Sequence, residues 1–334
     1  MLGAGKGYVF QGQGHKDAAS IIARFWPFSA CDAAFRRFGS PLKSCLQTAV
    51  IEGILPTLDV RLKWPRMIRM PLTLTPVVHG RLCHGSRWVI DDEDDLARKV
   101  AYLALGQSRH VAAILACIDK KAPSTRADTA EGAIKLLTVP KGLAAYHRDG
   151  WIFQSISWIA AHRYEAGAVV RAPHSIAAHK GFDGMQLRVD GKRQISAVVI
   201  FEDKATSNPR SKITGDVWSG IKALERGERM PELIQETGAL LEANQQRFPE
   251  LDIDAAIEAT VWEEVRHYRV AVTARDVHAS DVSRQALFKG FDIVAPGKRE
   301  RRQAETLFIP DLRKWMSHFA KKTIRQIEAW RDNV

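Results

Sequence analysis

The stretch that decides the fold runs from Lys180 to Thr206 and reads KGFDGMQLRVDGKRQISAVVIFEDKAT. Two runs within it, Phe182 to Val189 and Ser196 to Lys204, have the length and composition of β-strands. The segment between them contains Asp190-Gly191-Lys192, and Asp-Gly tolerates the positive φ that a tight hairpin turn needs. The stretch therefore predicts an antiparallel hairpin.

Charged residues stand at one end of this predicted hairpin. Asp183 lies at the start of the first strand, and Glu202 and Lys204 lie at the end of the second. Because side chains two apart on a strand face the same way, Glu202 and Lys204 project together and Asp203 points away. Pairing through the turn brings Asp183 opposite residues 199–204. We therefore expect two carboxylates and an ammonium group to converge at the end of a sheet.

This set of groups suits the hydrolysis of a phosphodiester bond. Two carboxylates can hold Mg²⁺, which prefers oxygen ligands and keeps several waters. The ion lowers the pKa of a bound water and neutralises charge that builds on the phosphate. Lys204 can position that water or steady the developing charge, and the backbone carbonyl of Asp203 is a further candidate ligand.

Asp183 and the Glu202-Asp203-Lys204 motif resemble the signature of the PD-(D/E)xK nuclease superfamily. The spacing of 19 residues between the two acids falls in the usual range, although Phe182 stands where Pro is common. The predicted order of helix, three strands, helices and strand over about residues 146–275 is similar to the family core. The resemblance implies an α/β fold with a restriction-endonuclease-like mixed sheet flanked by helices. It also implies Mg²⁺ or Mn²⁺ at Asp183, Glu202 and Asp203, and cleavage of DNA.

Glu165 is a candidate for a further acid, because many such nucleases carry one on the first helix. It ends the helix predicted over 150–165, opposite the apolar stripe of Ile152 and Ile156. The alternative is a solvated carboxylate at a helix end.

The charge balance favours a polyanionic partner, since 49 Lys and Arg residues exceed 38 Asp and Glu residues for a net charge of +11. Two basic loops can contact phosphates without reading sequence, or can be merely solvated. The residues concerned are Arg210 and Lys212 in the first loop, and Lys298, Arg299, Arg301 and Arg302 in the second.

Pro140 and Gly142 mark the predicted domain boundary. A mainly helical domain of residues 1–145, with short helices within 18–48, would bind the target or a partner, and residues 146–334 would form the nuclease domain. We further expect a strand at Phe291 to Ala295 and a last helix at about 310–331. Four cysteines without a CxxC pair, no membrane-length apolar run and no secretory signal favour a cytoplasmic protein.

Three functions remain open. The first is a DNA endonuclease of restriction, transposition or phage defence. The second is a non-catalytic nucleic-acid or protein-binding module in which Glu202 and Lys204 form only a structural ion pair. The third is a nuclease subunit that acts only beside a partner such as a helicase or ATPase, because the chain has no complete nucleotide-binding motif.

Overall fold

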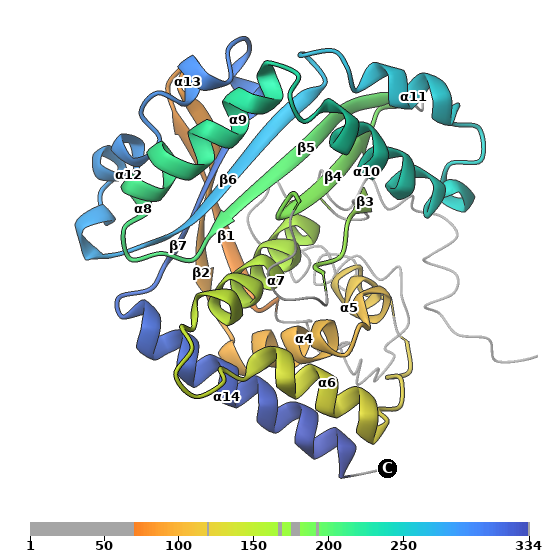
Figure 1. The fold of residues 1–334 in the computed structure, drawn as a ribbon, viewed down its shortest axis with the longest axis vertical. Helices are drawn as coiled ribbons and strands as arrows, with labels where there is room; N and C mark the ends of the chain where they lie inside the picture. The colour runs from red at the N-terminus through yellow and green to blue at the C-terminus, as the bar shows by residue number, and fades with distance from the viewer. Residues whose placement is uncertain (1–69, 119, 166–168, 175–180, 192–193, 333–334) are drawn as a thin grey trace, which may run out of the picture. The chain divides into compact units, whose positions relative to one another are not determined.

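Seven strands form one mixed, curled sheet in the computed structural model, which describes residues 70–118, 120–165, 169–174, 181–191 and 194–332 (Figure 1). The strand order is β1-β2-β7-β6-β5-β4-β3. Strands β2, β7, β6 and β5 run parallel, whereas β1 pairs antiparallel with β2, and β4 pairs antiparallel with β5 and β3. The strands are β1 (Leu72–His79), β2 (Cys83–Ile90), β3 (Val169–Val170), β4 (Gly184–Val189), β5 (Ile195–Lys204), β6 (Arg266–Ala274) and β7 (Arg302–Phe308).

Helices cover both faces of the sheet, and each face has its own apolar core (Figure 1). The first face carries α8 (Pro209–Lys212), α9 (Trp218–Glu225), α10 (Met230–Glu242), α11 (Ile253–Ala259), α12 (Asp281–Leu287) and α13 (Phe291–Val294). A π-helical turn, Ile213–Val217, joins α8 to α9. The second face carries α4 (Glu93–Ala104), α5 (Ser108–Leu115), α6 (Ala127–Leu137), α7 (Tyr146–Tyr164) and α14 (Leu312–Arg331).

The predicted hairpin is confirmed by the pairing of β4 with β5, which runs from Gly184 opposite Phe201 to Val189 opposite Ile195. Strand β5 is buried on both faces because β4 and β6 flank it and helices cover it. Val198 and Ile200 face the core beneath α9 and α10, whereas Val199 and Phe201 face α7. The predicted helix over 150–165 and the predicted last helix correspond to α7 and α14.

The strand predicted at Phe291 to Ala295 is wrong, because these residues form the short helix α13. Phe291 and Val294 are buried and lie three residues apart, which matches one turn of helix, and the Phe291 ring packs against Trp218. The strand that follows in the chain is β7, whose sequence RQAETLF is too polar to be recognised by its apolar pattern.

The domain division differs from the expected one where the chain is described. Strands β1 and β2 belong to the same sheet as β4 to β7, and residues 67–334 form one compact unit. The boundary expected after residue 145 falls at the N-terminus of α7, inside this unit. The helices expected within 18–48 lie outside the described residues.

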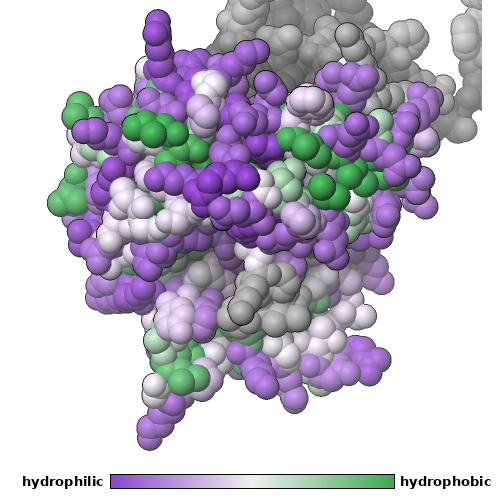
Figure 2. Space-filling model, turned by 45° about the horizontal axis from the view of Figure 1, so that its top comes forward, coloured by the Kyte–Doolittle hydropathy of each residue, from purple (hydrophilic) through white to green (hydrophobic). Residues whose placement is uncertain are grey.

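The outer surface of the helices above the sheet is largely polar. Figure 2 brings forward the side that carries α9 and α13, where hydrophilic residues predominate and hydrophobic ones stand in separate patches. Within the part of the chain that the structure describes, no helix combines the length and apolarity that crossing a membrane requires.

Candidate functional site

Asp183, Glu202 and Lys204 meet at the end of the β4–β5 hairpin. Gly184 pairs with Phe201, which places the preceding Asp183 beside the last residues of β5. Lys204 Nζ lies 2.6 Å from Asp183 Oδ2 and 3.0 Å from Glu202 Oε2. The structure thus brings together the three residues that the motif singles out, and one ammonium group contacts both carboxylates.

The Asp183 carboxylate is oriented by a strand and by a helix. The Asp203 backbone N–H donates to Oδ2 at 2.8 Å, and the Gln154 side-chain amide of α7 donates to Oδ1 at 2.7 Å. Gln154 was missed in the sequence because its position opposite Asp183 depends on how α7 packs on the sheet. Its only local signal is an amide side chain within the predominantly apolar run Trp151 to Ile156.

Gly184 permits the close approach of the two strands at this point. A Cβ at Gly184 would lie 2.6 Å from Phe201 Cδ2 and 3.2 Å from Phe201 Cγ. These distances are shorter than an apolar contact allows. The glycine that follows Asp183 therefore lets Phe201 fill the space under the hairpin while Asp183 stays beside Lys204.

The charges of the site depend on one another. Burial raises the pKa of the Glu202 carboxyl, and the nearby Lys204 ammonium partly offsets this effect. Burial opposes the charged form of Lys204, but the carboxylates of Glu202 and Asp183 outweigh it and raise the pKa of the ammonium group above its usual value. Lys204 therefore stays protonated, and an ionised Glu202 requires a cation beside it.

The Asp203 carboxyl points to the other face of the sheet, as the alternation along β5 requires. Its Oδ1 accepts a hydrogen bond from Ser157 Oγ of α7 at 2.8 Å. Burial raises the pKa of Asp203 to about 7, against the opposing effect of the Arg269 guanidinium. Asp203 reaches the site through its main chain, and its carboxyl belongs to the core beneath α7.

The donor set fits a small, hard cation. Within the described part of the chain, no cluster of three or more His, Cys, Asp or Glu side chains could hold a metal. The carboxylates of Asp183 and Glu202, with the Asp203 carbonyl as the predicted third donor, are all oxygen ligands. Mg²⁺ is commonly bound by one or two carboxylates and keeps several waters. A divalent cation would also stabilise the ionised form of the buried Glu202.

Glu165 is not joined to this site by any hydrogen bond or ion pair between described residues. It caps the C-terminus of α7, where its Oε2 accepts from Gln186 Nε2 at 2.6 Å and lies 3.3 Å from Arg188 Nε. Gln186 and Arg188 alternate with Met185 and Leu187 along β4, and the latter two pack beneath α9 and α10. Glu165 therefore pairs with the sheet face beneath α7.

The first basic loop is only partly available for phosphate contact. Arg210 donates to the backbone carbonyls of Leu287 and Lys289 at 2.7 and 2.9 Å, so it ties α8 to the end of α12. Lys212 is exposed and pairs with Asp216 at 2.9 Å. Of these two predicted contacts, Lys212 has the more accessible charge.

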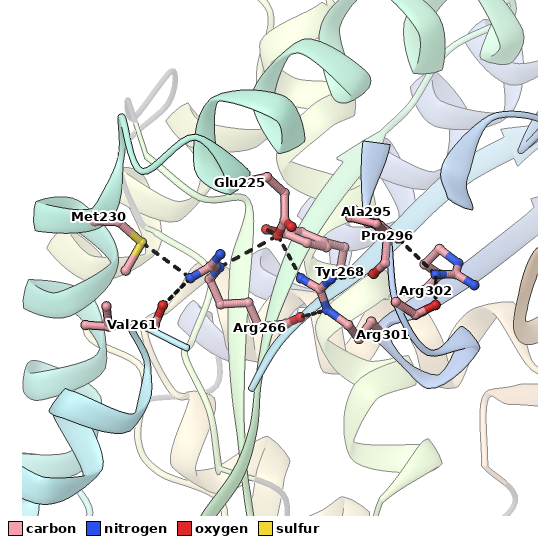
Figure 3. Close-up of polar contacts among 10 residues, drawn as sticks. Glu225, Met230, Val261, Arg266, Tyr268, Ala295, Pro296, Arg301 and Arg302 are labelled. Carbon is pink, nitrogen blue, oxygen red and sulfur yellow. Dashed lines mark hydrogen bonds and ion pairs between the residues drawn. The ribbon is translucent and has the colours of Figure 1, made fainter. Parts of the chain in front are cut away.

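The second basic loop contains two buried arginines (Figure 3). Arg301 lies 2.7 Å from Glu225 and donates to the Arg266 carbonyl at 2.9 Å. Arg302 donates to the Ala295 carbonyl at 2.9 Å. Because Arg301 and Arg302 are only 4% and 3% exposed, their guanidinium groups are out of reach of a phosphate at the surface.

Lys298 and Arg299 are the more accessible members of this second loop. Lys298 is exposed, and Arg299, whose side chain is 38% exposed, donates to the Gly80 carbonyl at 3.0 Å. The structure therefore divides the predicted phosphate contacts into surface groups and groups that hold the fold together.

No protein-family model and no curated protein sequence matches this chain. The function is therefore inferred from the geometry of the site.

Proposed function

We propose that this chain is a metal-dependent nuclease that hydrolyses DNA phosphodiester bonds at the site formed by Asp183, Glu202 and Lys204. The observation that carries the proposal is the contact of one lysine ammonium with two carboxylates, at 2.6 and 3.0 Å, at the end of a buried strand hairpin. Metal-assisted hydrolysis of a phosphodiester uses a cation held by oxygen ligands and a positive group near the phosphate, and this arrangement offers two carboxylates and an ammonium group for these tasks.

The path of the chain supports the resemblance to the PD-(D/E)xK superfamily. Helix α7 is followed by β3, β4 and β5, then by helices α8 to α11, and then by β6. Strand β5, which carries the E-x-K motif, is antiparallel to β4 and parallel to β6. This is the order of helix, three strands, helices and strand that the resemblance implies, so we propose a restriction-endonuclease-like core.

Each residue of the site has a distinct proposed role. Mg²⁺ or Mn²⁺, when bound, supplies a water of lowered pKa and positive charge beside the phosphate. Asp183 and Glu202 provide its carboxylate ligands, and Gln154 and the Asp203 N–H fix the orientation of Asp183. Lys204, which the carboxylates keep protonated, donates hydrogen bonds toward a phosphate oxygen or the attacking water.

A plasmid-nicking assay in Mg²⁺, in Mn²⁺ and in chelator tests the proposal. We expect cleavage only with the divalent ion, and a rate lower by about two to three orders of magnitude in Lys204→Ala. Lys135→Ala removes the same charge from an exposed position on α6 and should cleave at the wild-type rate. Circular dichroism establishes that each variant is folded. Cleavage that persists in Asp183→Ala or Glu202→Ala would refute the site.

A non-catalytic binding module is the second candidate, because Lys204 already satisfies both carboxylates in a closed set of ion pairs. In that case the wild-type chain binds DNA or a protein partner, cleaves nothing in any divalent ion, and loses only stability in Lys204→Ala. Cleavage that appears only after a helicase or ATPase is added would instead identify a subunit of a larger nuclease. We propose restriction, transposition or phage defence as the setting of the nuclease.

A further inference from the structure

A cavity of about 520 Å³ lies between the edge strand β1 and the start of α12. Its wall includes Thr75 and His79 of β1, Arg87 of β2, and Ser280, Asp281 and Arg284 of the α12 segment. Cavities that hold small ligands have volumes of about 300–1,000 Å³, so this cavity has room for a nucleotide-sized group.

Arg87 is the group in this wall that lacks a partner. Its guanidinium forms no hydrogen bond or ion pair with any residue that the structure describes, and its Nε is buried. Unpaired charge in a partly buried position is unfavourable, because the group has lost water without gaining a protein partner. An anionic ligand in the cavity would supply that partner.

Arg284 gives the cavity a fixed wall. It is 7% exposed and donates to the carbonyls of His278 and Ala279 at 3.2 and 2.6 Å, and it also pairs with Asp281. These contacts hold the turn that leads into α12. The Nε of Arg284 is buried without a partner, which leaves a further donor in this wall.

The remaining titratable groups of the wall leave an excess of positive charge. The hydrogen bond from Arg284 lowers the pKa of the Asp281 carboxyl, so Asp281 is ionised and balances Arg284. The Asp281 side chain is 76% exposed and sits at the rim. Burial lowers the pKa of His79, which keeps the imidazole neutral at pH 7. Arg87 also attracts Asp281, but one carboxylate faces two guanidinium groups, so the wall keeps one excess positive charge and favours an anion.

Arg87 and Lys204 lie in one row across the sheet. Arg87 is in register with Thr306, Thr306 with Val272, and Val272 with Lys204. The row spans three strand spacings, or about 14 Å, on the face covered by α8 to α13. Thr306 and Val272 are buried between these two residues, so a DNA strand that reaches both Arg87 and Lys204 must pass outside the helices that cover the row.

We propose that this cavity, with Arg87 as its principal contact, binds a phosphate group. A guanidinium offers two parallel N–H donors that match phosphate oxygens, and the hydroxyls of Thr75 and Ser280 are additional polar groups of the wall. The phosphate belongs either to the backbone of a DNA strand that also reaches Lys204, or to a free mononucleotide or inorganic phosphate. The first source rests on the proposed nuclease function, whereas the second does not.

The experiment compares wild type with Arg87→Ala and Arg325→Ala in chelator, so that no cleavage occurs. Arg325 is exposed on α14, on the opposite face of the sheet, and its replacement removes the same charge. A short labelled DNA duplex is titrated by fluorescence anisotropy over a range of salt, and inorganic phosphate and a mononucleotide are titrated by calorimetry.

We expect Arg87→Ala to bind DNA about tenfold more weakly, with a salt slope smaller by about one, while Arg325→Ala behaves as wild type. Loss of phosphate and mononucleotide binding with unchanged DNA affinity would also support the site and would assign it to a free ligand. Binding of all three probes by Arg87→Ala at wild-type affinity overturns the proposal.

Two features keep the test decisive. Arg87 makes no hydrogen bond with a described residue, so its loss should not lower the unfolding midpoint, and Arg87→Lys provides a second variant that keeps the charge but not the paired donors. Because binding is measured without a divalent ion, an inactive wild type that still shows Arg87-dependent binding refutes only the nuclease function.

Discussion

The raised pKa of the Asp203 carboxyl leads to a specific prediction about how the stability of the protein depends on pH. Burial raises the pKa of this group from 3.8 to about 7. A carboxyl whose pKa is raised by folding stabilises the protein fully below its unfolded pKa, and this contribution is lost as pH rises through the folded pKa. With these two values, the loss between about pH 5 and about pH 8 is about 2.5 kcal/mol.

Asp203→Asn isolates this contribution. The amide cannot ionise, and its oxygen can still accept the hydrogen bond from Ser157. We therefore expect the free energy of unfolding of the variant, relative to wild type, to rise by about 2.5 kcal/mol from about pH 5 to about pH 8. Urea unfolding at the two pH values measures the difference.

Asp254→Asn is the matched control, because Asp254 is exposed in the first turn of α11. Its pH profile should run parallel to that of wild type. Parallel profiles for wild type and Asp203→Asn would refute the reasoning, because they would show that Asp203 ionises in the folded protein as easily as in the unfolded chain.

Three further variants test the frame of the site. Gly184→Ala should lower the free energy of unfolding by about 1–3 kcal/mol, because its Cβ would meet Phe201 Cδ2 at 2.6 Å. Gly191 does not have the positive φ expected in the turn, and a Cβ there meets no atom within 4 Å, so Gly191→Ala should change the free energy little in the same urea titration. Equal stability of the two variants contradicts the close approach. Gln154→Ala should raise the Mg²⁺ concentration for half-maximal nicking at least about tenfold, since Asp183 loses its helix donor, and an unchanged Mg²⁺ titration argues against that role. Glu165→Gln should nick at nearly the wild-type rate, because Glu165 contacts Gln186 and Arg188. A loss of nicking as large as that of Asp183→Ala would place Glu165 in the proposed catalytic site.

The hairpin and the meeting of Asp183 with Glu202 and Lys204 could be predicted because both depend on local rules. Two short strands joined through Asp190-Gly191 have one simple pairing, and alternation along β5 decides which side chains share a face. The structure shows that pairing, with Gly184 opposite Phe201. Neither the hairpin nor the meeting of these charged residues depends on which helices pack on the sheet.

Strand β7 could not be predicted because its residues are largely polar and do not show the apolar pattern of a buried strand. Gln303 and Glu305 point into the core beneath α7, and Glu305 accepts hydrogen bonds from the Ser86 backbone at 2.8 Å and from the Trp88 indole at 2.9 Å. These partners lie on β2, more than 200 residues earlier in the chain. A polar strand in the centre of a sheet is stable only with such hydrogen-bond partners, and the sequence does not show which residues provide them.

Contacts between distant parts of the chain also explain why the burial of the second basic loop and the contact of Gln154 with Asp183 could not be predicted. The sequence shows that Arg301 and Arg302 are charged, but not that the loop folds back so that Glu225 and backbone carbonyls receive their donors. It shows that Gln154 lies on a helix, but not which strand end faces that helix. Each missed placement depends on a contact between elements far apart in the chain, whereas each confirmed placement depends on residues close together along it.

The buried charges beneath α7 also bear on how the candidate site is held. The Arg269 guanidinium lies 4.3 Å from the Phe201 ring centroid and 5.0 Å from that of Trp88, and it donates to the Ser157 carbonyl at 3.2 Å. Phe201 and Asp203 are thereby fixed from the face that solvent does not reach. Glu202 and Lys204 alternate with them and project to the opposite face, where their side chains remain 13% and 23% exposed.

This division has a consequence for interpreting variants of the sheet. Removing one partner from a buried charge network leaves the others unpaired and commonly costs about 3–5 kcal/mol. A replacement of Arg269 would therefore lower activity by loosening Phe201 and Asp203, although Arg269 faces away from Lys204. A variant of Lys204 acts on the opposite face of the sheet and leaves this network intact, although it unpairs Asp183 and Glu202. Variants of the network beneath α7 should lose both nicking and stability, whereas a residue whose variant loses nicking at an unchanged unfolding midpoint belongs to the chemistry.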